Sequence, residues 1–408
     1  MLDSILIGMS GMEGFSKGLK VISNNVANLN TPGFKSSGLL FTDAYYQQGA
    51  QGEMKFDGDG QPAQFGSGLA TLSSVINFQP GAVQQTSNPL DVSISGNGFL
   101  VSQDKEGALA FTRDGQTRFD NDGNLVSTTT GKYIMGYTSD GSQGLSRISL
   151  DGLRSNPPKA TANVTFSGNL TTGSATSAGT TPTDSTVTFA VNDALGGLHS
   201  LTAVFHNNGA ADPNGWTVTI SDGSTQVGTG KIGFIGGAPD PAKDKVTFDY
   251  TPSGGTSSAI TLDFSSNVTS FNSGNLSNLA TASQDGYGAG SISTTTFDKD
   301  GKLTITYSNG QTATGAQLAL ATVTATGDLQ QQGGGEFTTT NGVHTSFGRA
   351  NTAGLGSIVA NQIEESNVDL SGEFSNLIVM QRGYQASSNI LSTANDMLQQ
   401  LFDMKGAR

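Results

Sequence analysis

Two short stretches have the spacing of catalytic or phosphate-binding motifs. Residues 14–18 read GFSKG, the G-x-S-x-G spacing that in some hydrolases exposes a nucleophilic serine between a strand and a helix. No strand-like segment precedes Ser16, so we interpret it as an ordinary helix residue. Residues 228–233 read GTGKIG, but FIGGAPDP follows where a dinucleotide-binding loop needs a helix. We therefore predict a glycine-rich turn there.

Metal-ligating side chains are few. The chain has no cysteine, which excludes thiolate catalysis, disulfides and cysteine-ligated metals. His199, His206 and His344 do not have the spacing of metal ligands, so we expect them at the surface. The sequence therefore predicts no metal site.

Paired carboxylates also have simpler explanations than catalysis. Glu364 and Glu365 come just before a predicted helix, where solvation or helix capping accounts for them. FDNDGNL (119–125) and FDKDGKL (297–303) lack the closing glutamate of a calcium loop, so we predict hairpin turns. The sequence thus predicts neither an enzyme nor a cofactor.

Composition favours a β-rich chain with few charges. It has 408 residues, enough for two or three domains, with 56 glycines, 13% charged residues and a net charge of −13. Because no run of lysine or arginine occurs, we expect no nucleic-acid partner. Asp3, Glu13 and Lys17 make the N-terminus neither a secretory signal nor a membrane span, so export would need another route.

The first segment, from Leu2 to Val26, predicts an amphipathic helix. Apolar residues at spacings of three and four form a coiled-coil-like seam. The predicted seam residues are Leu2, Ile5, Met9, Met12, Leu19 and Val26. Four glycines flank this seam, and each costs a helix about 1 kcal/mol relative to alanine. Glycine also allows close backbone approach to a neighbour, so we expect the helix to form only when it packs against one. The four are Gly8, Gly11, Gly14 and Gly18.

The last forty residues predict a second helix of the same kind. Its apolar seam residues are Leu370, Phe374, Leu377, Tyr384, Leu391, Leu398 and Phe402. Gln381, Ser388 and Asn395 complete the heptad pattern, and polar seam residues can fix register and partner number. Ser366 and Asp369 predict a capping box at its start. For both helices, docking on the chain's own domain is the alternative.

Strand patterns fill the middle of the chain. Alternation such as STVTFAV and KVTFDY predicts strands, and DG and NG pairs predict the turns between them. Composition shifts near RSNPPKATANVTF and NLATASQDGYGAG mark two boundaries. We therefore predict that 156–283 is a β domain inserted into the one that flanks it.

The stretch NNVANLNTPGFK, residues 24–35, ends the first helix. Asn28 and Asn30 can terminate it, Thr31 before proline is extended, and Pro32-Gly33 fits the centre of a type II turn. Phe34 can then anchor the exit from the turn against apolar surface.

Several motifs together resemble a known family. NNVANLNTPGFK and residues 365–401, ESNVDLSGEFSNLIVMQRGYQASSNILSTANDMLQQL, are similar to the terminal signatures of bacterial flagellar axial (rod and hook) proteins. GNGFLVSQ, SNPLDVSI and FTRDGQTRFDNDGNLVSTTTGKYIMGY resemble the family's first β domain. Rod proteins generally lack a large second β domain, so the resemblance is closest to the hook proteins. The signature-turn residues are Asn25, Asn28, Asn30, Thr31, Pro32, Gly33 and Phe34.

The resemblance implies an α+β multidomain fold. The terminal helices would form an α-helical coiled-coil inner domain (1–30 and 366–408), joined by a connector (31–75 and 359–365) to two mainly-β outer domains. The first would span 76–155 and 284–358, and the second, inserted in it, 156–283.

The resemblance also implies a function. Subunits would polymerise into the curved, extracellular hook tube that passes motor torque to the filament. Partners would be further copies of the chain, the rod, hook cap and hook–filament junction proteins and the flagellar type III export apparatus, without membrane insertion. The alternatives are a distal rod protein with an enlarged insertion and, from another class, a secreted β-rich adhesin or carbohydrate-active enzyme.

Overall fold

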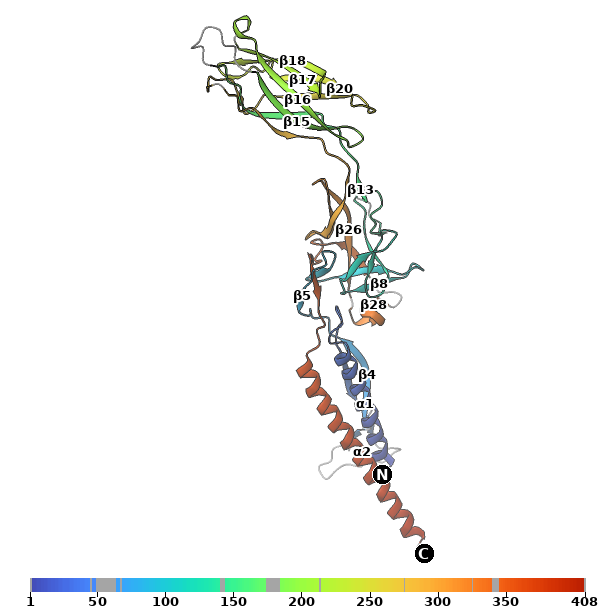
Figure 1. Ribbon diagram of the computed structural model, residues 1–408. Helices are drawn as coiled ribbons and strands as arrows, with labels where there is room; N and C mark the ends of the chain where they lie inside the picture. The colour runs from blue at the N-terminus through green and yellow to red at the C-terminus, as the bar shows by residue number, and fades with distance from the viewer. Residues whose placement is uncertain are drawn as a thin grey trace. The chain divides into compact units, whose positions relative to one another are not determined.

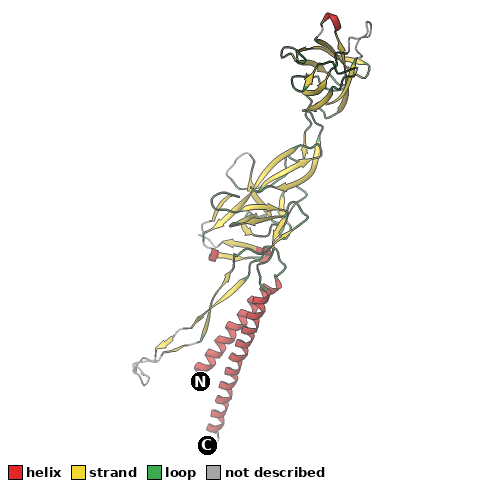
Figure 2. Ribbon diagram, turned by 90° about the vertical axis from the view of Figure 1, so that its left-hand side faces the viewer, coloured by secondary structure: helices red, strands yellow, loops and turns green. Residues whose placement is uncertain are grey.

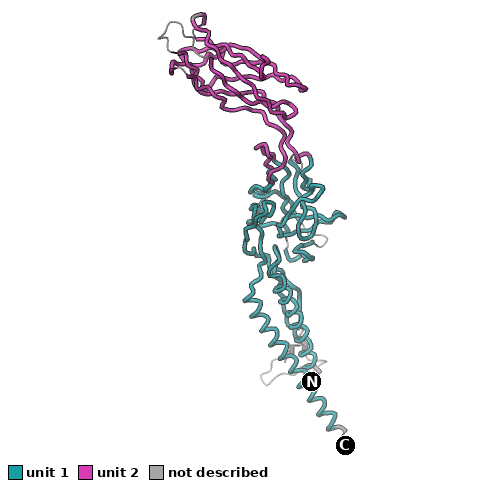
Figure 3. The backbone as a smooth tube through the Cα atoms, in the orientation of Figure 1, with its two compact units in different colours: residues 1–151, 295–304, 314–408 teal, residues 152–294, 305–313 magenta. Residues whose placement is uncertain are grey.

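The chain forms two compact units, coloured separately in Figure 3. The computed structural model describes residues 2–44, 46–48, 64–66, 68–139, 144–173, 184–212, 214–274, 276–324, 326–339 and 345–406. Unit 1 comprises residues 1–151, 295–304 and 314–408, and unit 2 comprises 152–294 and 305–313. Long helices and many strands together confirm the predicted multidomain α+β class.

Two long helices lie near the ends of the chain, side by side in unit 1 (Figure 1 and Figure 2). α1 spans Leu2–Ala27, in agreement with the predicted helix. α2 spans Leu370–Gly406. Its N-cap is Asp369, whose Oδ1 accepts the N–H of Ser371 at 3.0 Å. The predicted capping box is wrong, because the Ser366 hydroxyl instead accepts the Val368 N–H, 3.4 Å away and outside the helix.

The strands of unit 1 form a small hairpin and a β body. The hairpin pairs β1 with β4 antiparallel and carries a second pair, β2 with β3. These strands are β1 (Ser37–Asp43), β2 (Tyr46–Gln48), β3 (Gln64–Gly66) and β4 (Leu69–Ile76). The β body comprises β5 (Val83–Gln85), β6 (Val92–Ser95), β7 (Phe99–Gln103), β8 (Leu109–Thr112), β9 (Thr117–Phe119), β10 (Leu125–Ser127), β11 (Tyr133–Tyr137), β12 (Ser146–Arg147), β27 (Leu329–Gln331), β28 (Glu336–Thr339), β29 (Thr345–Arg349), β30 (Ser357–Ala360) and β31 (Gln362–Glu364).

One antiparallel sheet dominates the β body. Its order is β26 (Thr312–Val323), β11, β7, β8, β28 and β27, with β29 beside β26. In its core the half-buried Phe78 meets Phe99 and Phe337 edge to face, and the latter two rings are tilted against each other, with ring centroids 5.4–5.9 Å apart. Two short pairs, β30 with β6 and β31 with β5, complete the body.

Unit 2 consists of two facing sheets. One is antiparallel in the order β15-β16-β17-β18-β19, and the other runs β20-β21-β14-β22 with β23 beside β14. The strands of these two sheets are β14 (Asn163–Asn169), β15 (Ser185–Asn192), β16 (Leu198–Asn207), β17 (Gly215–Asp222), β18 (Thr225–Ile235), β19 (Ala238–Pro239), β20 (Lys245–Tyr250), β21 (Ser258–Asp263), β22 (Val268–Thr269) and β23 (Ala280–Gln284). β13 (Ser155–Asn156) lies outside them and pairs with residues 290–291. The chain passes between the units along β24 (Gly290–Phe297), β25 (Lys302–Tyr307) and β26.

The core of unit 2 is a sandwich of large apolar side chains from both sheets. Phe166 stacks on Phe264 with ring centroids 4.8 Å apart and meets Phe205 and Phe189 edge to face. Trp216 is 1% exposed, and its indole N–H donates to the Ser270 hydroxyl at 3.2 Å. A tight turn joins β17 to β18, where Gly223 has φ 57° and open space around it.

The structure resolves the motif-like stretches. Ser16 lies within α1, beside Lys17, which pairs with Glu13. GTGKIG lies inside β18, so the predicted turn is wrong. Cβ atoms on Gly228 and Gly230 would lie under 3.0 Å from side chains of β20, so glycine allows the two strands to pack closely.

The other candidate residues lie in ordinary structural roles. Residues 120–124 and 298–302 form the expected turns, closed by Gly123 N–H to Asp120 O and Gly301 N–H to Asp298 O. His199 pairs with Asp193 and His206 with Asp184, and His344 lies outside the described residues. In the described part of the chain, no three acidic or histidine side chains gather as a metal site, and no helix is long and apolar enough to cross a membrane.

Candidate assembly interface

Small residues bring α1 and α2 close together. A Cβ atom added to Gly11 would lie 2.6 Å from the Ser387 hydroxyl oxygen, and one on Gly8 would lie 3.3 Å from the Ser387 carbonyl oxygen. One on Gly18 would lie 2.9 Å from the sulfur of Met380. The glycine flank of α1 thus faces α2 at close range. In the reverse direction the Phe15 ring of α1 packs on Gly383 of α2, where an added Cβ would lie 2.6 Å from the ring.

The hairpin covers another side of α1. A Cβ on Gly14 would lie 2.7 Å from a methyl carbon of Leu69 on β4 and 3.4 Å from the ring of Phe41 on β1. The Ser10 hydroxyl accepts the Leu69 N–H at 3.1 Å. Each glycine of the flank therefore permits a close contact, three with α2 and one with the hairpin.

The predicted seam of α1 lies beside this contact. Ile5, Met12, Leu19 and Val26 are half-buried, and Met9 is 52% exposed. The side chain of Leu2 lies outside the described part of the structure. The α1 residues buried against the rest of unit 1 are instead Gly8, Gly11, Gly14, Gly18, Ile22 and Asn25.

The predicted seam of α2 is divided between two faces. Leu377, Leu391 and Leu398 are half-buried on the face that carries Ser387 and Ala394. Exposed residues of the predicted seam are Leu370, Phe374, Tyr384 and Phe402, with the polar Gln381, Ser388 and Asn395. Only part of the predicted seam is therefore used within one chain.

Both helices expose large apolar side chains to solvent. On α2 the exposed fractions are 58% for Ile378, 61% for Val379 and 70% for Phe402. On α1, Leu6 is 57% exposed. Such a concentration of apolar surface on a pair of helices indicates a surface that another protein covers.

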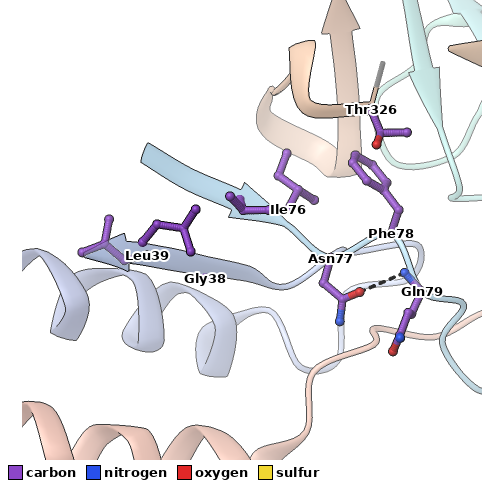
Figure 4. A pocket seen from close by; sticks show the side chains of 9 residues that line it. Gly38, Leu39, Ile76, Asn77, Phe78, Gln79 and Thr326 are labelled. Atoms are coloured by element: carbon purple, nitrogen blue, oxygen red, sulfur yellow. Dashed lines mark hydrogen bonds between the residues drawn. The ribbon is translucent and has the colours of Figure 1, made fainter. Parts of the chain in front are cut away.

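A groove lies where the hairpin meets the β body (Figure 4). Its volume is about 640 Å³, and its lining carries no charged side chain. The lining residues are Gly38, Leu39, Leu40, Val75, Ile76, Asn77, Phe78, Gln79 and Thr326. Leu40 and Val75 are 50% and 47% exposed, so this groove also presents apolar side chains at the surface.

The signature stretch ends α1 through asparagine side chains. After Ala27, the Asn28 amide donates to the Asn24 carbonyl oxygen at 2.9 Å, and the Thr31 hydroxyl donates to Asn28 Oδ1 at 3.1 Å. Asn30 is exposed. Asn28 thus occupies the end of the helix, as expected.

The turn after the helix contacts the β body. Gly33 has φ 70°, and the Phe34 N–H donates to the carbonyl oxygen of Thr31 at 3.2 Å, the hydrogen bond of a turn centred on Pro32-Gly33. A Cβ on Gly33 would lie 2.4 Å from the backbone nitrogen of Asp114, and Phe34 is 4% exposed. Glycine is needed both for the positive φ and for this close approach.

Two asparagines tie the turn to α2. The buried Asn25 exchanges two hydrogen bonds with the backbone of Ser37, and its amide donates to Glu373 Oε1 at 2.8 Å. Asn367 Oδ1 accepts the Ser36 N–H at 2.7 Å, and its amide donates to the carbonyl oxygens of residues 77 and 79. The family-like asparagines therefore connect segments that are far apart in sequence.

Comparison with known proteins follows the same segments. Three sequence models match: flagella basal body rod protein at residues 5–35, the D1 domain of flagellar hook protein FlgE/F/G at 93–179, and the C-terminal of flagellar basal body rod FlgEFG protein at 360–404. The flagellar hook protein FlgE of Borreliella burgdorferi is 30% identical over 99% of this chain and 100% of its own length. The chain belongs to the flagellar hook protein family.

Other hook proteins extend this relationship. FlgE of Escherichia coli K12 is 27% identical over 97% of this chain and 98% of its own. The crystal structure of Helicobacter pylori hook protein FlgE2 aligns at 14% identity with a TM-score of 0.45, over 67% of this chain and 98% of that one. The hook proteins are a structural family, not an enzyme family.

One buried polar cluster of this hook-family chain was not predicted from the sequence. Glu364 is 2% exposed and bonded to Lys35 and Arg113, so the expectation that solvent or capping explains it is wrong. Lys35 closes the signature stretch, yet no local pattern reveals a partner 329 positions away.

Proposed function

We propose that this chain is the structural subunit of a flagellar hook and polymerises through its terminal helices. The relatives that match over nearly its whole length are hook proteins, located outside the cell in the flagellar hook. The observation that carries the mechanism is the set of large apolar side chains that α1 and α2 leave exposed. Packing of these surfaces between copies would supply the hydrophobic stabilisation that one copy lacks.

The proposed interface includes the seam residues that one chain leaves accessible. Met9 of α1 and Phe374, Tyr384 and Phe402 of α2 would contact helices of neighbouring copies. Leu377, Leu391 and Leu398 would hold the pair together within each subunit. The predicted coiled-coil inner domain, 1–30 and 366–408, thus gives the tube its cohesion.

The proposed outer domains would act in bending. Residues 76–155 with 284–358 form the first β domain, 156–283 the second, inserted in it, and 31–75 with 359–365 the connector. Outer surfaces rich in Ser, Thr, Asn and Gly would exchange modest polar contacts as a curved tube rotates and passes torque to the filament.

The partners follow from this role. Besides further copies of itself, the subunit would meet the rod, the hook cap, the hook–filament junction proteins and the type III export apparatus. The absence of cysteine and the glycine cost in α1 suit passage of an unfolded chain through an exporter.

Electron microscopy of the purified chain under polymerising conditions tests the proposal. We expect supercoiling tubes. Straight, stiff rods would instead support the distal rod alternative, which the full-length match to hook proteins does not favour. A chain without residues 1–30 and 366–408 should fail to polymerise, and polymers formed without both termini would contradict the proposed interface.

A further inference from the structure

Three segments that are far apart in sequence meet where the helices end and the β body begins. They are the segment 33–37 that leads from the turn after α1 to the start of β1, the segment 77–82 that joins the hairpin to β5, and the segment 363–369 from the end of β31 to α2. Backbone hydrogen bonds link them pairwise. The Gly33 N–H donates to the Glu364 carbonyl oxygen at 2.8 Å, and the Glu365 N–H donates to the Ala82 carbonyl oxygen at 2.7 Å. We call these three segments the junction.

One carboxylate lies at the centre of the junction. Glu364 Oε1 accepts hydrogen bonds from the Lys35 ammonium and from the Gly81 N–H, the latter at 3.0 Å. Its other oxygen, Oε2, accepts Arg113 Nη1 at 3.1 Å. The side chains of Lys35, Glu364 and Arg113 are 1%, 2% and 7% exposed. A single buried anion thus touches two of the other segments and the β body.

The two cations are anchored on different sides. Lys35 Nζ also donates to the Gln79 carbonyl oxygen at 2.8 Å, which adds a second bond between the turn and the 77–82 segment. Arg113 donates to the carbonyl oxygens of Ile94 and Gly96, at 3.3 and 2.8 Å, and lies over the Phe99 ring at 5.4 Å. Arg113 therefore belongs rigidly to the β body, whereas Lys35 belongs to the turn.

The charges depend on one another. Burial lowers the pKa of Lys35, the nearby Arg113 lowers it further, and the hydrogen bond and charge of Glu364 oppose both effects. Without the carboxylate, two buried cations would face each other with no counterion, which is strongly unfavourable. Backbone packing leaves little slack, because a Cβ on Gly81 would lie 2.0 Å from the Glu365 carbonyl oxygen.

We propose that Lys35, Glu364 and Arg113 form an ionic lock that makes the three segments of the junction open and close as one unit. When the lock is closed, α1, the hairpin and α2 are held in one arrangement on the β body. When the Glu364 carboxylate is lost, all three segments loosen together while the sheet of the β body stays folded. If the chain is a hook subunit, the lock transmits force from its helices to its outer domains.

Hydrogen exchange of the full-length chain, followed by mass spectrometry, tests the lock. In the unmodified chain, peptides covering 33–37, 79–82 and 363–367 should be protected. In Glu364→Gln we expect exchange at least about tenfold faster in all three peptides, and unchanged exchange in peptides from β7 and β8. Faster exchange in 363–367 alone, or no protection in the unmodified chain, would overturn the proposal.

The matched control is Glu336→Gln. Glu336 is 3% exposed and accepts Lys132 at 2.5 Å and the Ser102 and Thr130 hydroxyls at 3.1 Å, all within the β body. It should speed exchange around β28 without opening the junction. If it opens the junction as Glu364→Gln does, the effect is general destabilisation and the lock is refuted.

If Glu364→Gln unfolds the β body, a less disruptive substitution tests the lock. Arg113→Lys keeps the charge but loses the fork that reaches two carbonyl oxygens. It should raise exchange in the same three peptides by a smaller factor. A change confined to the peptide around 113 would contradict the lock. None of these measurements requires polymerisation, so they can fail independently of the proposed function.

Discussion

The helix pair of unit 1 and the sandwich of unit 2 are stabilised in opposite ways. In unit 2, Phe166, Phe205, Phe264 and Trp216 are at most 1% exposed, and the three phenylalanines pack ring against ring. Across the two helices, Ile22 and Ala394 are the apolar side chains that reach full burial among the described residues. The sandwich buries its large apolar side chains within one chain, whereas the helices leave most of theirs exposed to solvent.

This difference suggests a division of roles, in which unit 2 folds on its own and the helices of unit 1 need other copies to cover their apolar side chains. Glycine and serine at the α1–α2 contact bring two backbones together without burying much apolar area, so the gain for one subunit is small. The remaining apolar surface stays available for other copies. We therefore expect mutations in the helices to change assembly, and mutations in the sandwich to change folding of unit 2.

Leu391→Asp should have the largest effect on assembly. It puts a charge on the half-buried face of α2, so polymerisation should be abolished while both units keep their β structure. Sedimentation and electron microscopy measure the polymer, and circular dichroism measures the fold. Leu391→Met, which keeps an apolar side chain of similar volume at the same position, is the control and should still assemble. Normal tubes from Leu391→Asp would contradict the proposal that this half-buried face of α2 is needed for assembly. Met12→Asp should behave similarly.

Phe166→Ala tests the other half of the comparison. Removing a ring from the sandwich should cost about 3–5 kcal/mol in the free energy of unfolding of unit 2. Fluorescence of Trp216, the single tryptophan of the chain, reports this transition directly. Leu276→Ala, at a residue that is 83% exposed, should leave it unchanged. Equal effects of the two substitutions would show that the sandwich is not packed as described.

Gly11→Ala should have a smaller effect, because alanine favours the helix but its methyl group meets the Ser387 hydroxyl. We expect the polymer to need a several-fold higher subunit concentration, about 1 kcal/mol. Ser387→Ala removes the obstructing oxygen, and the double variant should assemble at least as well as the unmodified chain. Additive losses would mean that these two residues do not meet.

The smallest effects concern pH, and they have opposite sign in the two units. Burial raises the pKa of Asp114 in unit 1, although the Thr129 hydroxyl and the Gln116 N–H partly oppose it. The native state then holds a proton that the unfolded state has released, so stability falls as pH rises through that window. In Asp114→Asn, the free energy of unfolding of unit 1 should no longer fall with rising pH on account of this group.

In unit 2 the hydrogen bonds prevail instead. Burial favours a higher pKa for Asp285, but the N–H groups of Asn163 and Ala162, each 2.9 Å away, and Lys159 lower it overall. That contribution is present above the ordinary carboxyl pKa and is lost as pH falls. Chemical denaturation of Asp114→Asn and Asp285→Asn between about pH 3 and pH 7 checks both signs. Parallel profiles for the two variants would contradict the contrast.

Local patterns predicted the elements better than their contacts. The extent of α1, the turn at Gly33 and the hairpin turns at 120–124 and 298–302 follow from spacing and from glycine chemistry within a few residues. The face of α1 that meets α2 was predicted by its glycines and not by its apolar seam, since the seam selects the exposed Met9, whereas Gly11 of the glycine flank lies against α2. Where backbones approach closely, the smallest residue marks the contact.

Long-range features were invisible for a physical reason. Glu364 is buried because Arg113, 251 positions away, and Lys35, 329 positions away, both reach it. GTGKIG resembles a turn by composition, but it lies in a strand, and side chains of β20 pack directly against its glycine backbone. In each case the partner that decides the structure comes from a different part of the chain. Whether the predicted seam residues meet other subunits stays a prediction.

The β17–β18 turn of unit 2 has a practical consequence. Gly223 has φ 57° and no neighbouring atoms within 4 Å of a side chain placed there, and the helices that would carry assembly belong to unit 1. A short epitope or dye-binding peptide inserted at this turn should leave folding and tube growth intact. The label would make single tubes visible by light microscopy, so that their twisting and bending could be followed on live cells in real time.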